Sequence, residues 1–253
     1  MVVAATALDA RAIDALCTRG FAKIPHWMPE HRTAEVLMDV LELDRTGLLA
    51  ECSLGREGKI DTRVRRSRML DLYNWDLSGS RTVHSNACGS PDTRFELCKS
   101  ISSLQDQLST AFASRSTHIE KLAPFHTETH YLSYPDGGHY RRHLDVAVQN
   151  DSRGWSRMGR AVSDGGSFSG SEARRTISFL LYLNPGWEES MGGALRIFDD
   201  RDGDRTFDIL PEAGTLVLFD SCRLEHEVRP TLRSRQCVVG WFKSVREREA
   251  APS

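Results

Sequence analysis

Residues 134–146 have the sequence YPDGGHYRRHLDV, which joins a tight turn to a short β-strand. The turn, Pro135-Asp136-Gly137-Gly138, combines residue types that favour chain reversal. In a strand, residues i and i+2 point to the same face, so His143 and Asp145 should present an imidazole and a carboxylate side by side. Such a pair is either half of a metal site or a hydrogen-bonded pair, and the rest of the chain must decide between them.

The pattern of short β-rich runs separated by turns begins near residue 125 and continues almost to the end of the chain. The runs include HTETHYLSY, RTISFLLYLN, GALRIFD, GTLVLFD, LEHEVRP and RQCVVGWFK. Turn residues separate them at Asn184-Pro185-Gly186, Gly192-Gly193, Asp202-Gly203 and Pro211-Glu212-Ala213-Gly214. Regularly spaced short strands with such turns predict an antiparallel sandwich or barrel.

The first half of the chain has a different character. Apolar residues at helical spacing predict helices over 8–19, 28–43 and 91–115, with a short strand at 21–25, whereas the polar, basic stretch 44–80 predicts loops with one strand. Helices first and strands afterwards indicate an α+β fold with a mostly β core. We expect a support region, 1–124, packed on a core, 125–245, as a single structural domain.

The composition favours neither a membrane nor a nucleic acid partner. The 253 residues carry a formal net charge of -2, and the pI is about 6.5, so there is no excess of basic residues to attract an anionic surface. No run approaches the roughly 20 apolar residues of a membrane span. Asp9 and Asp14 interrupt the N-terminal apolar run, which predicts an amphipathic helix rather than a signal peptide. The six scattered cysteines are expected to be reduced thiols in a cytoplasmic protein.

One segment, residues 149–175, breaks the rhythm of strands and turns. It is rich in Ser, Gly and Arg and directly follows the strand that carries His143 and Asp145. A segment this polar is expected to be a mobile insertion rather than part of the core. It is either an ordinary linker between strands or a lid over the site.

A second imidazole turns the His143–Asp145 pair into a possible metal site. His226 lies in the strand-like run LEHEVRP, and two histidines and one carboxylate from separate strands of a barrel can meet at one point. This set is a 2-His-1-carboxylate facial triad, which leaves three positions open on an octahedral metal. The ligands favour Fe(II), although the affinity order alone does not exclude Co, Ni, Cu or Zn.

An arginine in the following run adds a second clue. Arg235 begins the apolar run RQCVVGWFK, and an arginine pointing into a barrel is costly unless an anion pairs with it. A dicarboxylate co-substrate would supply that anion in a bidentate pair. The alternative is a surface arginine grouped with Arg229 and Arg233, but its position after His226 favours the buried role.

These segments together resemble a known family. The pieces YPDGGHYRRHLD, LLYLNPGWEESMGGALRIF, PEAGTLVLFD, HEVRP and RQCVVGWF resemble the catalytic core of the Fe(II)/2-oxoglutarate-dependent dioxygenases, specifically the prolyl 4-hydroxylase-like branch. The resemblance covers about 130–243, and LCTRGFAKIPHWM near the N-terminus is similar to the first strand of hypoxia-sensor-type prolyl hydroxylases. It implies a double-stranded β-helix (jelly-roll) barrel supported by N-terminal helices.

The resemblance also implies a role for each site residue. His143, Asp145 and His226 would bind iron, and Arg235 would hold the distal carboxylate of 2-oxoglutarate. The co-substrate pocket would be completed by Tyr134 and Tyr182 on its walls, Leu195 on the methylene chain, and Trp241 near the iron. Without the family, Tyr182 and Leu195 would be interpreted as core residues and Tyr134 as an aromatic beside a turn.

The activity implied is hydroxylation of an unactivated C–H bond with Fe(II), 2-oxoglutarate and O₂, releasing succinate and CO₂, with L-ascorbate maintaining the iron. The first choice of substrate is a prolyl residue of a protein or peptide. The alternatives are a free amino acid or small natural product, or a non-catalytic protein that binds metal or ligand. A nucleic-acid demethylase is disfavoured by the acidic balance. Two departures from the family pattern, Val239 where some members have a small polar residue and the insertion at 149–175, leave the substrate open.

Three other motifs have simpler interpretations. HTETH (126–130) lacks the Glu directly after the first His that a zincin helix needs, and it predicts a strand. DDRDGD (199–204) lacks the order of a calcium loop and predicts a hairpin turn. RVRRSR (63–68) predicts a solvated loop, with a substrate groove as the alternative.

Overall fold

The helices form where the sequence places their caps. The computed structural model describes residues 5–54, 59–75, 81–115, 117–145, 171–199 and 205–247. Helix α1 (Ala10–Arg19) begins after Asp9, whose carboxylate accepts a hydrogen bond from the backbone N–H of Ala12, and ends at Gly20 with a φ of 85°. Helix α2 spans Glu30–Arg45. Helix α3 (Pro91–Ala113) begins after Ser90, whose hydroxyl accepts from Thr93 N–H. All three predicted helices are confirmed to within a few residues.

Two antiparallel sheets make up most of the structure. The major sheet has the order β1-β12-β9-β14-β7-β4-β2, and the minor sheet has the order β11-β10-β13-β8-β3. The major sheet comprises β1 (Phe21–Ile24), β12 (Leu216–Asp220), β9 (Ser171–Tyr182), β14 (Arg235–Glu247), β7 (Leu122–Tyr134), β4 (Arg68–Asp71) and β2 (Ala50–Glu51). The minor sheet comprises β11 (Arg205–Ile209), β10 (Leu195–Asp199), β13 (His226–Val228), β8 (His139–His143) and β3 (Arg65–Arg66). A small hairpin, β5 (Tyr73–Trp75) and β6 (Arg81–Val83), and the 3-10 helix η1 (Glu189–Met191) complete the elements.

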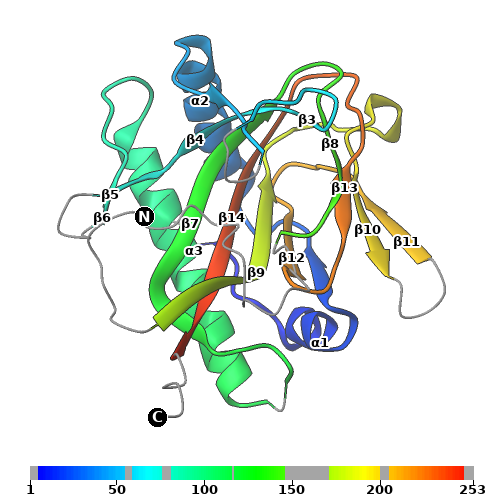
Figure 1. Ribbon diagram of the computed structural model, residues 1–253. Helices are drawn as coiled ribbons and strands as arrows, with labels where there is room; N and C mark the ends of the chain where they lie inside the picture. Colours follow the sequence, from blue (N-terminus) through cyan, green and yellow to red (C-terminus); the bar gives the residue numbers. More distant parts are fainter. Residues whose placement is uncertain are drawn as a thin grey trace.

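The two faces of the major sheet bury different partners. Figure 1 shows helices α2 and α3 on one side of the major sheet and the minor sheet on the other. Alternation along β7 follows this division, because Tyr131 packs in the apolar cluster that includes the helices, and Leu132 packs in the cluster between the sheets. The structure is therefore α+β with a mostly β core, as predicted, although the two sheets face each other without closing into one continuous barrel.

The turn that opens the quoted stretch forms as predicted. Gly138 N–H donates to the carbonyl of Pro135 at 2.7 Å, and Gly137 has a φ of 71°, which favours glycine. The turn also contacts a segment that is distant in sequence, because Gly137 N–H donates to the carbonyl of Thr231. It therefore fixes the start of β8 beside the segment that precedes β14.

Two expectations about the strands were wrong in detail. The described part of the stretch 44–80 holds four short strands, β2 to β5, rather than one, because β4 pairs with the edge of β7 and β3 pairs with β8. Of the predicted insertion, residues 149–170 lie outside the described part of the chain. Residues 171–175 instead begin β9, where Arg174 and Arg175 pair with β14. Among the described residues, no helix has the length and apolar character to cross a membrane.

Candidate active site

The two predicted histidine ligands face each other across the minor sheet. His143, the last residue of β8, is the register partner of His226, the first residue of β13. Their ring centroids are 4.2 Å apart. Packing fixes both rings, because Tyr140 stacks on His143 at 3.6 Å and Phe219 lies against His226 at 4.6 Å. The pairing of β8 with β13 therefore brings together residues that are distant in sequence.

The carboxylate of Asp145 completes the group. Its Oδ1 lies 3.6 Å from Nε2 of His143 and 3.7 Å from Nε2 of His226. One ligand atom from each of the three residues lies within 4.8 Å of the others, an arrangement that could hold a metal ion. Asp145 lies beyond the end of β8, so the expected strand carrying both residues on one face is wrong. The three side chains nevertheless converge.

The backbone sets which nitrogen of each histidine is available. Nδ1–H of His143 donates to the carbonyl of Arg141 at 2.7 Å, and Nδ1–H of His226 donates to the carbonyl of Leu224 at 3.2 Å. In the neutral form of each ring, Nε2 is then the nitrogen without a proton, and it lies toward Asp145. Metal-binding histidines commonly have this arrangement, in which the second nitrogen is anchored to a carbonyl.

The electrostatics also suit metal binding. Burial lowers the pKa of His226 to about 4, with a further contribution from the nearby His143, so the imidazole is neutral near pH 7. Burial disfavours the charged form of Asp145, but His226, His143 and Arg175 outweigh it and hold the pKa of Asp145 well below its usual range. A neutral imidazole and an ionised carboxylate are the forms that bind a divalent metal.

Arg235 is fully buried at the start of β14, opposite Tyr134 of β7. The rings of Tyr134 and Tyr182 lie 4.9 and 5.1 Å from its guanidinium carbon. Nη1 donates to Sγ of Cys237 at 3.5 Å, whereas Nε and Nη2 have no hydrogen-bond partner within the described ranges. A buried guanidinium with two unused donors fits an added carboxylate.

The other predicted pocket residues surround this arginine. Tyr134, Tyr182 and Leu195 all belong to the apolar cluster between the sheets. Burial raises the pKa of both tyrosines, which keeps the phenols neutral. The hydroxyl of Tyr182 is buried and, in the part of the chain that the structure describes, has no hydrogen-bond partner. Gly193 (φ +68°) is needed here, because a Cβ would lie 3.1 Å from Cδ of Arg235.

Trp241 lies on the face of the major sheet that packs against the minor sheet. Its cross-strand neighbour contacts one of the three candidate metal ligands. Trp241 is the cross-strand partner of Ser178 in β9, and the hydroxyl of Ser178 donates to Oδ2 of Asp145 at 2.5 Å. The guanidinium of Arg175 lies 3.5 Å above the Trp241 ring. Ser178 and Arg175 were missed in the sequence. The available signal for Ser178 was a single polar residue inside the apolar run ISFLLYL, since a buried hydroxyl needs a partner.

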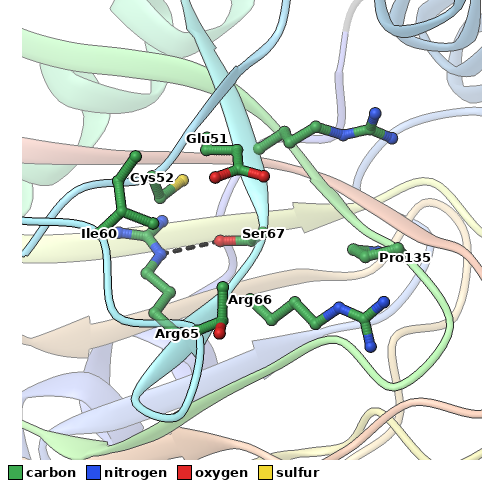
Figure 2. Close-up of a pocket in the computed structure, with 9 residues that line it drawn as sticks. Glu51, Cys52, Ile60, Arg65, Arg66, Ser67 and Pro135 are labelled. Carbon is green, nitrogen blue, oxygen red and sulfur yellow. Dashed lines mark hydrogen bonds between the residues drawn. The ribbon is translucent and has the colours of Figure 1, made fainter.

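The basic stretch 63–68 is a solvated loop only in part, because Arg63 is exposed in a turn. Residues 65–68 instead include β3 and the start of β4, and they line a cavity of about 220 Å³ with Cys52 and Pro135 (Figure 2). Arg65 donates from Nε to the hydroxyl of Ser67 at 2.9 Å and lies over the Tyr140 ring at 4.6 Å. Because Tyr140 stacks on His143, the side chain of Arg65 borders the candidate active site.

A family comparison matches the same part of the chain. Residues 129–243 match the family model described as 2OG-Fe(II) oxygenase superfamily. This range contains all three residues of the metal-ligand group and Arg235. The chain thus resembles this superfamily over the matched range and is prolyl 4-hydroxylase-like, which confirms the resemblance seen in the sequence.

Individual relatives agree with this class. The crystal structure of a Pseudomonas putida prolyl-4-hydroxylase superposes on 93% of this chain and 98% of its own, with a TM-score of 0.65 and 26% identity. A prolyl hydroxylase from Trichoplax adhaerens, in complex with a hypoxia inducible factor peptide fragment, covers 91% of this chain and 86% of its own, with a TM-score of 0.64 and 24% identity. The predicted double-stranded β-helix fold is confirmed by these likenesses.

A curated relative matches a shorter stretch. The hypoxia-inducible factor prolyl hydroxylase of Caenorhabditis elegans is 32% identical over 122 residues, which is 47% of this chain. The aligned segment spans 16% of the length of that relative.

Proposed function

We propose that the chain is an Fe(II)- and 2-oxoglutarate-dependent oxygenase that hydroxylates an unactivated C–H bond, with a prolyl residue of a protein or peptide as the first choice of substrate. The observation that carries the proposal is a pair of sites on facing inner surfaces. One is the group His143, Asp145 and His226, and the other is the buried Arg235, which has no carboxylate partner among the described residues. In the balanced reaction, C–H, O₂ and 2-oxoglutarate give C–OH, succinate and CO₂.

The donor set fits Fe(II). His143 and His226 would bind the metal through Nε2, because each Nδ1 is engaged with a carbonyl, and Asp145 would bind through Oδ1. A facial triad of this kind leaves three positions open for a co-substrate and O₂. When bound, the metal supplies the oxidising chemistry, and the protein supplies geometry and a dry pocket. The packed rings of Tyr140 and Phe219 hold the two imidazoles in place.

The arginine site fits the distal carboxylate of 2-oxoglutarate. Nε and Nη2 of Arg235 and the hydroxyl of Tyr182 are buried donors without partners among the described residues, so a carboxylate would satisfy three groups at once. The ring of Tyr134 and the side chain of Leu195 would pack on the apolar part of the co-substrate. Trp241 would border the side of the pocket nearest the metal.

The choice of a prolyl substrate rests on relatives rather than on a contact in this chain. The P. putida protein is a prolyl-4-hydroxylase and shares 26% identity over almost the whole length of both chains. A free amino acid or a small natural product is the alternative substrate. L-Ascorbate is proposed to keep the iron reduced. The cytoplasm is the proposed compartment, because all six cysteines are free thiols, which persist under reducing conditions.

The test is succinate formation by purified protein supplied with Fe(II), 2-oxoglutarate, ascorbate and O₂, with and without proline-containing peptides. We expect turnover that a peptide stimulates. His143→Ala should abolish the turnover, because only two ligands remain. Arg235→Ala should recover turnover only at high 2-oxoglutarate concentration, because it removes the anion site and leaves the ligands in place.

The outcomes separate the alternatives. Stimulation by small molecules but by no peptide would replace the prolyl substrate with a small-molecule one. Absence of succinate from folded, iron-loaded protein across a broad panel of substrates would refute the oxygenase and favour a protein that only binds metal or ligand. Omission of ascorbate should reduce the number of turnovers, and an unchanged yield would remove ascorbate from the proposal.

A further inference from the structure

Asp145 is the least constrained of the three candidate ligands. His143 and His226 are paired in the minor sheet and anchored through Nδ1. Asp145 lies two residues beyond the end of β8 and therefore outside the sheet pairing. A carboxylate can rotate and offer either oxygen or both to a metal. Contacts from its own side chain must therefore hold it in one orientation.

A pair of buried serines provides such contacts. Ser178 of β9 donates from Oγ to Oδ2 of Asp145 at 2.5 Å, and Ser178 Oγ lies 2.8 Å from Oγ of Ser221. Both serines are fully buried. Ser221 follows the end of β12, where its N–H donates to the carbonyl of Thr176 at 3.0 Å. The pair is therefore anchored on two neighbouring strands of the major sheet.

Proton counting gives the pair a direction. An ionised carboxylate only accepts hydrogen bonds, so the single hydroxyl proton of Ser178 must be directed to Asp145. The hydroxyl of Ser221 must then donate to Ser178. A chain of this kind runs from Ser221 through Ser178 to Asp145, and each bond polarises the next one.

We infer that Ser178, supported by Ser221, is a positioning residue that holds Asp145 with Oδ1 toward the two histidines. Oδ2 is the oxygen engaged by Ser178, and Oδ1 is the oxygen 3.6 and 3.7 Å from the two Nε2 atoms. The major sheet thus orients a ligand that the minor sheet does not constrain. This inference rests on the proposed metal site and adds to it the residues that keep Asp145 presenting one oxygen.

The test measures metal binding, not turnover. Mn(II) is used in place of Fe(II) because it does not oxidise in air under the conditions of the titration. It is titrated into the apoprotein, and free Mn(II) is measured by electron paramagnetic resonance. Removing groups that orient metal ligands typically costs about 10- to 100-fold in affinity. We therefore expect Ser178→Ala to raise the Kd for Mn(II) by about tenfold or more. Ser178→Thr keeps the hydroxyl and should recover most of the affinity.

The chain offers a closely matched control in Ser133. This serine is also fully buried in the major sheet, donates to a carboxylate, Asp44, at 2.8 Å, and accepts a hydrogen bond from Gln236. It points to the helix side of β7, away from the candidate ligands. Ser133→Ala should lower the melting temperature but leave the Kd for Mn(II) within about twofold of wild type, since a lost hydrogen bond affects stability wherever it lies.

The possible results separate two failures. If wild-type protein binds Mn(II) in a way that His143→Ala abolishes, the metal site stands, and a Ser178→Ala Kd within about twofold of wild type would overturn the inference alone. If Ser133→Ala lost as much affinity for Mn(II) as Ser178→Ala, the inference would also be overturned, because the effect would then come from general destabilisation of the fold. If wild-type protein binds no Mn(II), both the metal site and the inference fail. If Ser178→Ala does not fold, Ser221→Ala decides, with a loss of about threefold or more expected and a Kd within about twofold of wild type overturning the inference.

Discussion

Replacing Arg235 with methionine should weaken co-substrate binding far more than it weakens the fold. The guanidinium is fully buried, and within the described ranges its Nε and Nη2 atoms have no partner. The side chain therefore contributes two unused donors and a charge that no described carboxylate balances. Methionine fills much of the same space without a charge and adapts to irregular gaps.

The magnitude follows from the contacts that a carboxylate would make. Truncating one partner of a buried, hydrogen-bonded charge pair costs about 2 to 5 kcal/mol. Since each 1.4 kcal/mol is a factor of ten, the affinity for 2-oxoglutarate should fall by roughly 30- to 4000-fold. The unliganded protein should lose no more than about 1 kcal/mol of stability, because removing an unpaired charge offsets the lost contacts with the two tyrosine rings.

A second buried arginine provides the control. Arg94 is also fully buried, but its Nη1 donates to Asp39 at 2.8 Å, and its other donors reach backbone carbonyls, including that of His84. Arg94→Met leaves Asp39 buried without its cation and should cost about 3 to 5 kcal/mol of stability. The substitution should not change the affinity for 2-oxoglutarate, because Arg94 lies on the helix side of the major sheet.

The assay is thermal unfolding with and without 2-oxoglutarate. A ligand at 100 times its Kd stabilises the folded state by about 2.7 kcal/mol. At that concentration the ligand should stabilise Arg235→Met by no more than about 0.9 kcal/mol, roughly a third of the wild-type effect, and by close to zero at the upper end of the affinity loss. Arg94→Met should start at a lower melting temperature and show the full shift. The reasoning is refuted if Arg235→Met retains the ligand-induced shift, or if it destabilises the unliganded protein as much as Arg94→Met does.

Three further predictions concern residues around the pocket. Tyr182→Phe removes a buried hydroxyl donor and should raise the KM for 2-oxoglutarate about tenfold, by the cost of one hydrogen bond to a charged group; an unchanged KM in the succinate assay would exclude that contact. Burial disfavours the charged form of His130, but hydrogen bonds to Asp71 and Glu128 and the charges of these two carboxylates together outweigh it and raise the pKa of His130 above 6.5. The stability that the charged His130 contributes is fully present below pH 6.5 and is lost as the pH rises through the folded-state pKa. The substitution His130→Gln should therefore lower the melting temperature more at pH 5.5 than at pH 8.5. Equal losses of melting temperature at the two pH values would contradict a charged His130. Gly193→Ala places a Cβ at a φ of +68° and against Arg235; it should cost about 1 to 3 kcal/mol in denaturant unfolding, and an unchanged midpoint would show that the turn adapts.

The fold was predictable to the extent that local chemistry determines it. Caps such as Asp9 and Ser90 and turn glycines such as Gly137 act within a few residues, so their positions can be read directly. The short strands in 44–80 could not be predicted, because they form only by pairing with the edges of β7 and β8. Such pairing depends on which strand edges the rest of the fold leaves available.

The convergence of the three candidate ligands could be predicted from the sequence, but the residues that support them could not. His143, Asp145 and His226 lie in a motif order that the family resemblance makes specific, and their convergence in the structure agrees with it. Ser178 could not be assigned a role, because its partner, Asp145, follows a strand of the other sheet and is reached only through the tertiary fold. The expectation that Asp145 shares a strand with His143 was wrong because the strand ends before Asp145.

The two fully buried arginines show why burial alone does not identify a functional cation. Arg94 and Arg235 are equally inaccessible, but Arg94 of α3 has a carboxylate from α2 and carbonyls from the segment between β6 and α3 as acceptors. Arg235 faces aromatic rings and a thiol, which leave its Nε and Nη2 without an acceptor among the described residues. A fold that stabilised Arg235 for its own sake would have placed an acceptor beside it. The absence of one among the described residues therefore supports the proposal that the acceptor arrives with a ligand, and the convergence of His143, Asp145 and His226 supports a ligand that also binds a metal.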